Sequence, residues 1–162
     1  MCETVERLMK TIEDSKLNTL EVVMPKDVNT SNRLFGGVLM SWIDIIAGLT
    51  AYKHTGVICT TASVDYISFE QPIYMGQTVR LESRLTYVGN SSMEIRVDSY
   101  IEQYTKNDRI HVSKAYLTYV SIDETGKPIL APRLQLKTEE EQLEWNSGLE
   151  RAKYNKQRRT EH

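Results

Sequence analysis

The segment from residue 34 to residue 52 is almost wholly apolar or small, and it constrains the fold more than any other part of the sequence. On a helix of about 100° per residue, its bulky side chains gather on one stripe and its small or polar ones on another. The bulky stripe comprises Val38, Leu39, Trp42, Ile43, Ile46 and Leu49. The small strip comprises Ser41, Asp44, Gly48 and Ala51. We expect the bulky stripe to pack in a core and the small strip to leave room for something to lie against it.

The sequence that follows this helix is dominated by strands. Residues 58–69 are rich in β-branched side chains, residues 78–88 and 93–104 alternate between apolar and polar, and residues 110–122 form a last long strand. Short turns join the last three of these strands, which favours an antiparallel meander. We therefore predict an α+β fold in which one long central helix is wrapped by a twisted antiparallel sheet.

Both ends of the chain lie outside this meander. Residues 20–24 read as a first strand, and the charged segment up to about Asn18 is expected to be a short helix or a loose arm. From Thr138 the sequence predicts a C-terminal helix, since Thr138 and Glu141 have the spacing of a capping box.

Composition and charge exclude several functions. The formal net charge of −2 over 162 residues gives no electrostatic case for binding nucleic acid. No window approaches the roughly 20 apolar residues that a membrane span needs, and we expect no membrane partner. The N-terminus lacks the apolar region of a signal peptide, and Cys2 and Cys59 are too few for a disulfide scaffold. We expect a cytoplasmic protein, with Cys59 as a small core residue and no metal site.

Asp44 is the one charge in the middle of the apolar helix. A carboxylate taken out of water costs several kcal/mol, ~3–5 when left unpaired, unless something compensates it. Asp44 is therefore either a structural acid bonded to a neighbouring hydroxyl or arginine, or a functional group. Two glycines, Gly36 and Gly37, open the helix, so a ligand can approach its first free N–H groups closely.

Five segments, in this order and spacing, resemble the hotdog-fold acyl-CoA thioester hydrolases. They are residues 32–40, 42–44, 61–65, 69–73 and 89–94, and the resemblance covers roughly residues 18–135. It is strongest to the small, single-domain bacterial branch, which is related to the brain-type cytosolic enzyme. The resemblance implies a single hotdog thioesterase domain over residues 1–137 and a C-terminal helical tail over residues 138–162. It also implies self-association into hotdog dimers, three of which commonly form a hexamer, and no cofactor, since coenzyme A is part of the substrate and product.

The resemblance also implies roles for single residues. Asp44 matches the family's catalytic acid, acting as a general base on water or as a nucleophile on the thioester carbonyl. Gly37 would lend its backbone N–H to the developing oxyanion. Asn32 is matched to an asparagine that reaches the site from the opposite subunit. Thr61 matches a hydroxyl that faces the site, although it also suits a strand threonine paired across the ladder.

Other residues are candidates for binding the coenzyme A part of the substrate. The turn Gly89, Asn90, Ser91 and Ser92 matches one that lies along the pantetheine and phosphates, although two strands of this length also need a turn to reverse direction. Basic residues of the tail, Arg151, Lys156 and Arg158, are candidates for the nucleotide end, and the tail also reads as a solvated surface helix.

One difference from other hotdog proteins argues against a dehydratase or hydratase reaction. Dehydratases and hydratases of this fold use a histidine near the start of the central helix, where this chain has Phe35, and His54 is interpreted as a residue that caps the helix C-terminus. We therefore predict hydrolysis of fatty acyl-CoA to free acid and coenzyme A. The alternative is a hotdog domain that binds or senses acyl-CoA without cleaving it.

Overall fold

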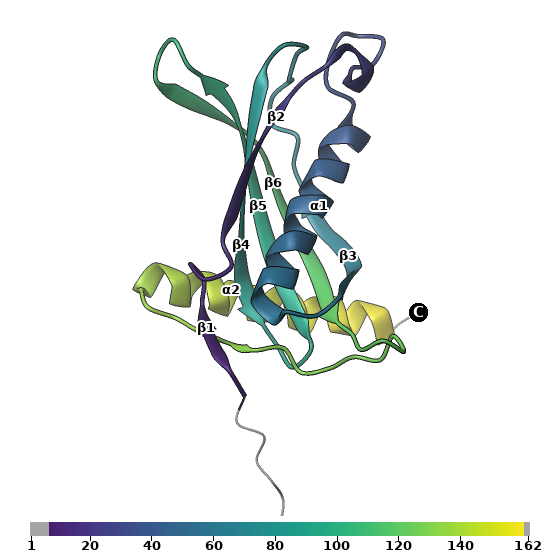
Figure 1. Ribbon diagram of the computed structural model, residues 1–162, viewed down its shortest axis with the longest axis vertical. Helices are drawn as coiled ribbons and strands as arrows, with labels where there is room; N and C mark the ends of the chain where they lie inside the picture. The colour runs from purple at the N-terminus through teal and green to yellow at the C-terminus, as the bar shows by residue number, and fades with distance from the viewer. Residues whose placement is uncertain (1–6, 161–162) are drawn as a thin grey trace, which may run out of the picture.

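A long helix lies across one face of a five-stranded antiparallel sheet in the computed structural model, which describes residues 7–160 (Figure 1). The helix is α1 (Gly36–Thr55), and the strands occur in the order β2-β4-β5-β6-β3. Their bounds are β2 (Leu17–Val22), β3 (Cys59–Ile67), β4 (Thr78–Val88), β5 (Ser92–Gln103) and β6 (Asp108–Ser121). The predicted α+β hotdog fold, with its meander from β4 to β6, is confirmed.

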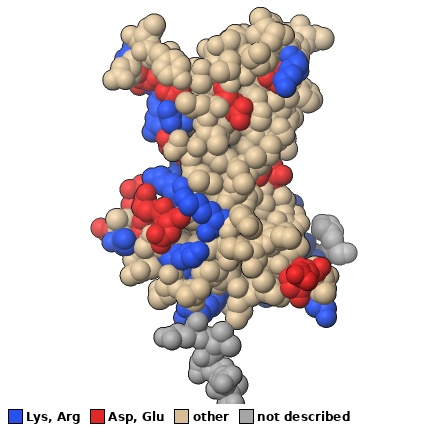
Figure 2. All heavy atoms as spheres, in the orientation of Figure 1, with Lys and Arg blue, Asp and Glu red and all other residues tan. Residues whose placement is uncertain are grey.

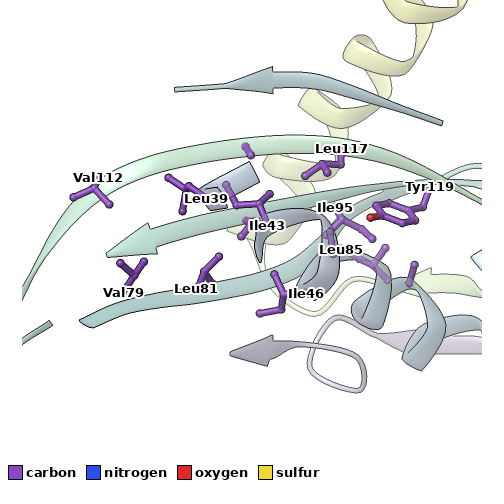
Figure 3. Packing of buried hydrophobic residues seen from close by; sticks show 14 of the residues in the cluster. Leu39, Ile43, Ile46, Val79, Leu81, Leu85, Ile95, Val112, Leu117 and Tyr119 are labelled. Atoms are coloured by element: carbon purple, nitrogen blue, oxygen red, sulfur yellow. The ribbon is translucent and has the colours of Figure 1, made fainter. Parts of the chain in front are cut away.

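The core lies between α1 and the inner face of the sheet (Figure 3). Leu39, Ile43 and Ile46 of α1 are all at most 2% exposed. They pack against inward-facing residues of three strands, including Val79, Leu81, Leu85, Ile95, Val112 and Leu117. Full burial of each such side chain contributes about 1.5–3 kcal/mol, so this interface supplies most of the fold's hydrophobic stability.

The predicted division of α1 into two strips is wrong at its C-terminal end. Leu49 is half-exposed, whereas Ala51, assigned to the open strip, is completely buried. The core-facing side continues through Ala47 and Thr50, whose hydroxyl donates to Ser83 Oγ at 2.8 Å. Small side chains here let the helix lie close to β4, which a pattern of bulky residues cannot reveal.

The end of α1 also differs from the prediction. Gly56 is the C-cap residue, with φ of 72°, and its N–H donates to Tyr52 O at 2.8 Å. His54 does not cap the helix. It is completely buried beneath the segment before β7, and its Nε2 lies 2.9 Å from Pro132 O.

The N-terminal segment is neither a helix nor a loose arm where the structure describes it. Residues of β1 (Met9–Thr11) pair in parallel with β7 (Arg133–Gln135), and a short 3₁₀ helix, η1 (Pro25–Asp27), precedes α1. The pairing joins residues far apart in the sequence, so no local pattern predicts it. Residues 1–6, including Cys2, lie outside the described residues.

The C-terminal helix α2 (Glu139–Thr160) lies on the outer face of the sheet, opposite α1 (Figure 1). Its predicted capping box is present, since Glu141 N donates to Thr138 Oγ1 at 3.1 Å and Thr138 N to Glu141 Oε2 at 3.3 Å. The predicted boundary at residue 137 falls between β7 and α2. That residues 1–137 form a domain without this helix stays a prediction. Among residues 7–160, no helix has the length and apolar character to cross a membrane.

Candidate active site

Asp44 lies near the middle of α1, where the helix faces the edge strand β3. Its side chain is half-buried, and Thr61 Oγ1 donates a hydrogen bond to Asp44 Oδ1 at 2.9 Å. Two residues that are far apart in the sequence, both named as site candidates, are thus in direct contact. The Tyr119 hydroxyl on β6 lies 2.5 Å from the same oxygen. Asp44 is therefore a carboxylate bonded to two hydroxyls at the open edge of the sheet.

Sequence reasoning missed Tyr119. A usable signal was present, since Tyr119 continues the inward-facing set of Ala115 and Leu117 but carries a hydroxyl. A buried phenol of this kind usually finds a hydrogen-bond partner, and the central helix is the element that such a set faces.

The N-terminus of α1 is open. The N-cap residue Phe35 makes no side-chain cap, and among residues 7–160 the amides of Gly36 and Gly37 have no hydrogen-bond acceptor. The Phe69 ring lies over Gly36, and a Cβ on Gly37 would sit 2.7 Å from Phe35 Cε1, too close for a larger residue without rearrangement. These amides form a partially positive end that suits a developing oxyanion.

A cavity of ≈ 390 Å³ lies at this end of the helix. It is lined by Asn29, Arg33, Leu34, Gly36, Leu39, Phe69, Glu70, Gln71, Pro72, Ile73 and Val112. Asn32 is exposed, has φ of 57° and is not among these lining residues. Asn29, which sequence reasoning passed over, lines the cavity, and its Oδ1 accepts bonds from the amides of Ser31 (2.9 Å) and Arg33 (3.2 Å).

The Gly37 amide and Asp44 lie far apart on α1. They are separated by seven residues, which is about 10 Å along the helix axis. An oxyanion donor and an attacking group both have to lie about 3 Å from the reacting centre. One helix therefore presents these two groups at separate places.

The surface around Asp44 is apolar and exposed. Ile45, Leu49 and Tyr52 of α1 are 60%, 49% and 55% exposed. Figure 2 shows that the face carrying α1 and β3 has few charges, most of which gather at its margins. An uncharged face of this kind next to an unpaired strand edge is typical of a protein–protein interface.

The turn between β4 and β5 presents donors to solvent. The carbonyl oxygens of Gly89, Asn90 and Ser91 all accept hydrogen bonds, from Arg7, from the Ala131 amide and from Ser121. The amides of Asn90 and Ser91, by contrast, have no acceptor among the described residues. With its acceptors used and its donors free, the turn has the polarity that suits an anion.

A cavity of ≈ 360 Å³ joins this turn to α2. All four turn residues line it, together with Lys153, Lys156 and Arg159 from the helix. Two of the basic residues named from the sequence lie elsewhere. Arg151 is ion-paired with Glu94 at 2.8 Å, and Arg158 lines a neighbouring hollow at residues 63–65. Within residues 7–160, no group of His, Cys, Asp and Glu side chains is arranged to hold a metal ion.

Comparison with known proteins identifies the family. A model of the thioesterase superfamily matches residues 31–106. The acyl-CoA thioester hydrolase YkhA of Bacillus subtilis is 40% identical over 147 residues, which cover 91% of this chain and 86% of the relative. The chain belongs to the acyl-CoA thioester hydrolases. The rat cytosolic acyl coenzyme A thioester hydrolase is 33% identical, and this chain spans 40% of its length.

Solved structures of similar proteins agree with this assignment. An acyl-CoA hydrolase of Staphylococcus aureus, in complex with butyryl coenzyme A and coenzyme A, is 35% identical with a TM-score of 0.89, covering 94% of this chain and 93% of its own. A hexameric acyl-CoA thioesterase is 32% identical with a TM-score of 0.88, covering 93% of this chain and 97% of its own. The present chain is thus an acyl-CoA hydrolase of the hotdog fold.

Proposed function

We propose that this acyl-CoA hydrolase cleaves fatty acyl-CoA to free fatty acid and coenzyme A, with Asp44 as the residue that activates the attack. The observation that carries the proposal is the carboxylate of Asp44, bonded by the Thr61 hydroxyl at 2.9 Å beside an open strand edge. Structures of the similar S. aureus enzyme include variants in which an aspartate, an asparagine and a threonine are each replaced by alanine. The same three residue types make up the site proposed here.

The chemistry needs no group beyond these side chains, water and a backbone amide. As a general base, Asp44 takes a proton from water while the water oxygen bonds to the thioester carbonyl carbon. The carbonyl oxygen becomes an oxyanion, which the Gly37 amide stabilises. The C–S bond then breaks, and the proton passes from Asp44 to the departing coenzyme A sulfur. As a nucleophile, Asp44 would instead bond to the carbonyl carbon and expel coenzyme A as its thiolate, which leaves an acyl anhydride that water cleaves in a second step.

The site is completed by a second copy of the chain. The separation of about 10 Å between Gly37 and Asp44 of one helix favours an oxyanion donor that comes from the partner. The uncharged face of α1 and β3 surrounds Asp44, so pairing across this face would bring a second helix N-terminus toward it. We propose a hotdog dimer on this basis, and a trimer of dimers as the larger assembly, for which the hexameric neighbour is the precedent.

The asparagine of the site is one of two in the loop before α1. Asn32 is the choice that the family resemblance gives, whereas Asn29 lines the cavity at the helix N-terminus. Asn29→Ala and Asn32→Ala are therefore compared directly, and the catalytic asparagine is the one whose loss lowers kcat rather than raising KM alone.

The turn of Gly89, Asn90, Ser91 and Ser92 holds the phosphates of coenzyme A in this proposal. Its free amides and hydroxyls converge with Lys153, Lys156 and Arg159 on one cavity. These groups offer the local positive potential that a nearly neutral protein needs in order to bind a heavily anionic carrier.

The decisive experiment is a thiol-release assay with acyl-CoAs from acetyl to stearoyl, on the wild type and on Asp44→Asn. The substitution keeps the shape of the side chain and removes its basicity, and it should lower kcat by about 100-fold. Ser41→Ala, also on the exposed side of α1, is the control. A folded Asp44→Asn protein with normal turnover would refute the role of Asp44, and a wild type that binds but never releases thiol would establish the sensing alternative.

The shared site has a separate test. Mixing Asp44→Asn with Gly37→Val subunits, each inactive, should restore part of the activity because some mixed dimers carry one intact site. Light scattering should show a dimer or three dimers at micromolar concentration. Absence of recovery after demonstrated subunit exchange, or an active monomer, would contradict a site built across two chains.

A further inference from the structure

The Tyr119 side chain extends from the inner face of β6 to the middle of α1. It is 2% exposed, and its ring lies against Gly48, one helical turn beyond Asp44 (Figure 3). Its hydroxyl lies 2.5 Å from Asp44 Oδ1 and 2.7 Å from the Asp44 backbone oxygen. The phenol therefore contacts both the carboxylate and the main chain of the residue proposed to activate the attack.

Tyr119 acts as a donor to Asp44 in this position. Its burial and its hydrogen bond to Asp44 raise the pKa of the phenol well above its ordinary value, so it keeps its proton throughout the working range. Thr61 is paired with Tyr119 across the β3–β6 ladder, and its hydroxyl donates to the same carboxylate oxygen. Two neighbouring strands thus direct one hydroxyl each at Oδ1.

The other carboxylate oxygen, Oδ2, differs from Oδ1 in its hydrogen bonding. Among residues 7–160, no donor reaches Asp44 Oδ2. The two bonds to Oδ1 fix the rotation of the carboxylate. Oδ2 is left free to accept a proton or to attack.

We propose that Tyr119 is a positioning residue of the hydrolase, which together with Thr61 holds Oδ1 of Asp44 so that Oδ2 is the reacting oxygen. The inference rests on the proposed role of Asp44. The proposal gives the Tyr119 hydroxyl a role in the reaction, although the ring itself is part of the apolar core. This role explains why a tyrosine rather than a phenylalanine follows Leu117 on the inward face of β6.

The test is the pH dependence of thiol release by Tyr119→Phe. Removal of the hydroxyl should lower kcat by about tenfold, the worth of one hydrogen bond to a charged group, with a smaller effect on KM. It should also move the acidic limb of the kcat/KM profile to higher pH, whereas the loss of a purely structural tyrosine would leave that limb in place. The matched control is Tyr116→Phe on the opposite face of the same strand, where the ring lies under Arg151 with a guanidinium-to-centroid distance of 4.1 Å.

A second variant covers the case in which Tyr119→Phe fails to fold. Fluorotyrosine at position 119 keeps the shape of the side chain and is a stronger donor, so the acidic limb should move to lower pH. An acidic limb that stays in place in both variants would overturn the inference, even if stability falls, because that is the result expected of a purely structural tyrosine. A wild type without thiol release would instead overturn the proposed function, so the two failures are distinguishable.

Discussion

Gly148 gives the sharpest test of how α2 is held on the sheet. It is the only buried residue among those described in this helix, and a Cβ there would lie 2.7 Å from Tyr87 Cβ and 2.9 Å from Glu94 Oε1. Neither neighbour moves easily, because Tyr87 Cβ is fixed by the β4 backbone and Glu94 is bonded to Thr86 at 2.6 Å and to Arg151 at 2.8 Å.

Gly148→Ala therefore sets two effects of opposite sign against each other. Helix propensity alone would stabilise the protein by about 1 kcal/mol, since alanine replaces glycine inside a helix. Overpacking of a site that cannot relax costs about 1–3 kcal/mol, and displacement of the partly buried Glu94–Arg151 pair adds to that cost. We expect a net loss of about 1–3 kcal/mol, which lowers Tm by about 2–12 °C in a domain of this size.

The assay is thermal and urea unfolding followed by circular dichroism, at one fixed protein concentration because the protein is expected to be oligomeric. Ser147→Ala, at an exposed neighbouring position on the same helix, is the matched control and should leave Tm unchanged or slightly higher. A shifted α2 would also displace Lys153 and Lys156 from the cavity at the turn, so Gly148→Ala should raise KM for acyl-CoA. A Gly148→Ala protein as stable as the wild type would refute the close packing of α2.

Three further predictions follow from the same structure. Burial lowers the pKa of His54, so the folded state disfavours its proton and stability should fall as pH drops below about 6.5, whereas His54→Gln should lack this step in melts across pH. Replacing Ser91 and Ser92 together by alanine should raise KM for acyl-CoA with kcat nearly unchanged, and an equal effect on an acyl-pantetheine thioester would exclude contact with the nucleotide and its phosphates. A chain ending at Lys137 should still unfold cooperatively by circular dichroism but bind acyl-CoA more weakly, and a gradual transition would show that α2 belongs to the domain.

The strands and the central helix could be predicted because their patterns are local. Alternation over residues 78–88 gives the observed bounds of β4, since side chains on one face of a strand repeat every two residues. The high proportion of apolar residues predicted the buried helix. Asp44 could be singled out without any knowledge of its neighbours because it is the one acidic residue in that helix.

Contacts between distant segments could not be predicted in this way. The pairing of Met9 with Arg133 leaves no periodic signal in three residues, and the burial of Ala51 rather than Leu49 depends on how closely α1 lies against β4. Whether Asn29 or Asn32 lines the cavity at the N-terminus of α1 depends on the path of the loop. The residue type does not specify that path.

The sequence by itself determined that this protein is an apolar helix wrapped by an antiparallel sheet, with one carboxylate at its centre and two glycines at its start. Periodicity and the free energy of burying apolar surface suffice for that much, because both act on neighbouring residues. Only the tertiary structure decided what that carboxylate touches. Thr61 and Tyr119 reach Asp44 from adjacent strands because β3 pairs with β6, and hydrogen bonds of this kind depend on distances of a few tenths of an ångström that are fixed when the whole sheet closes over the helix.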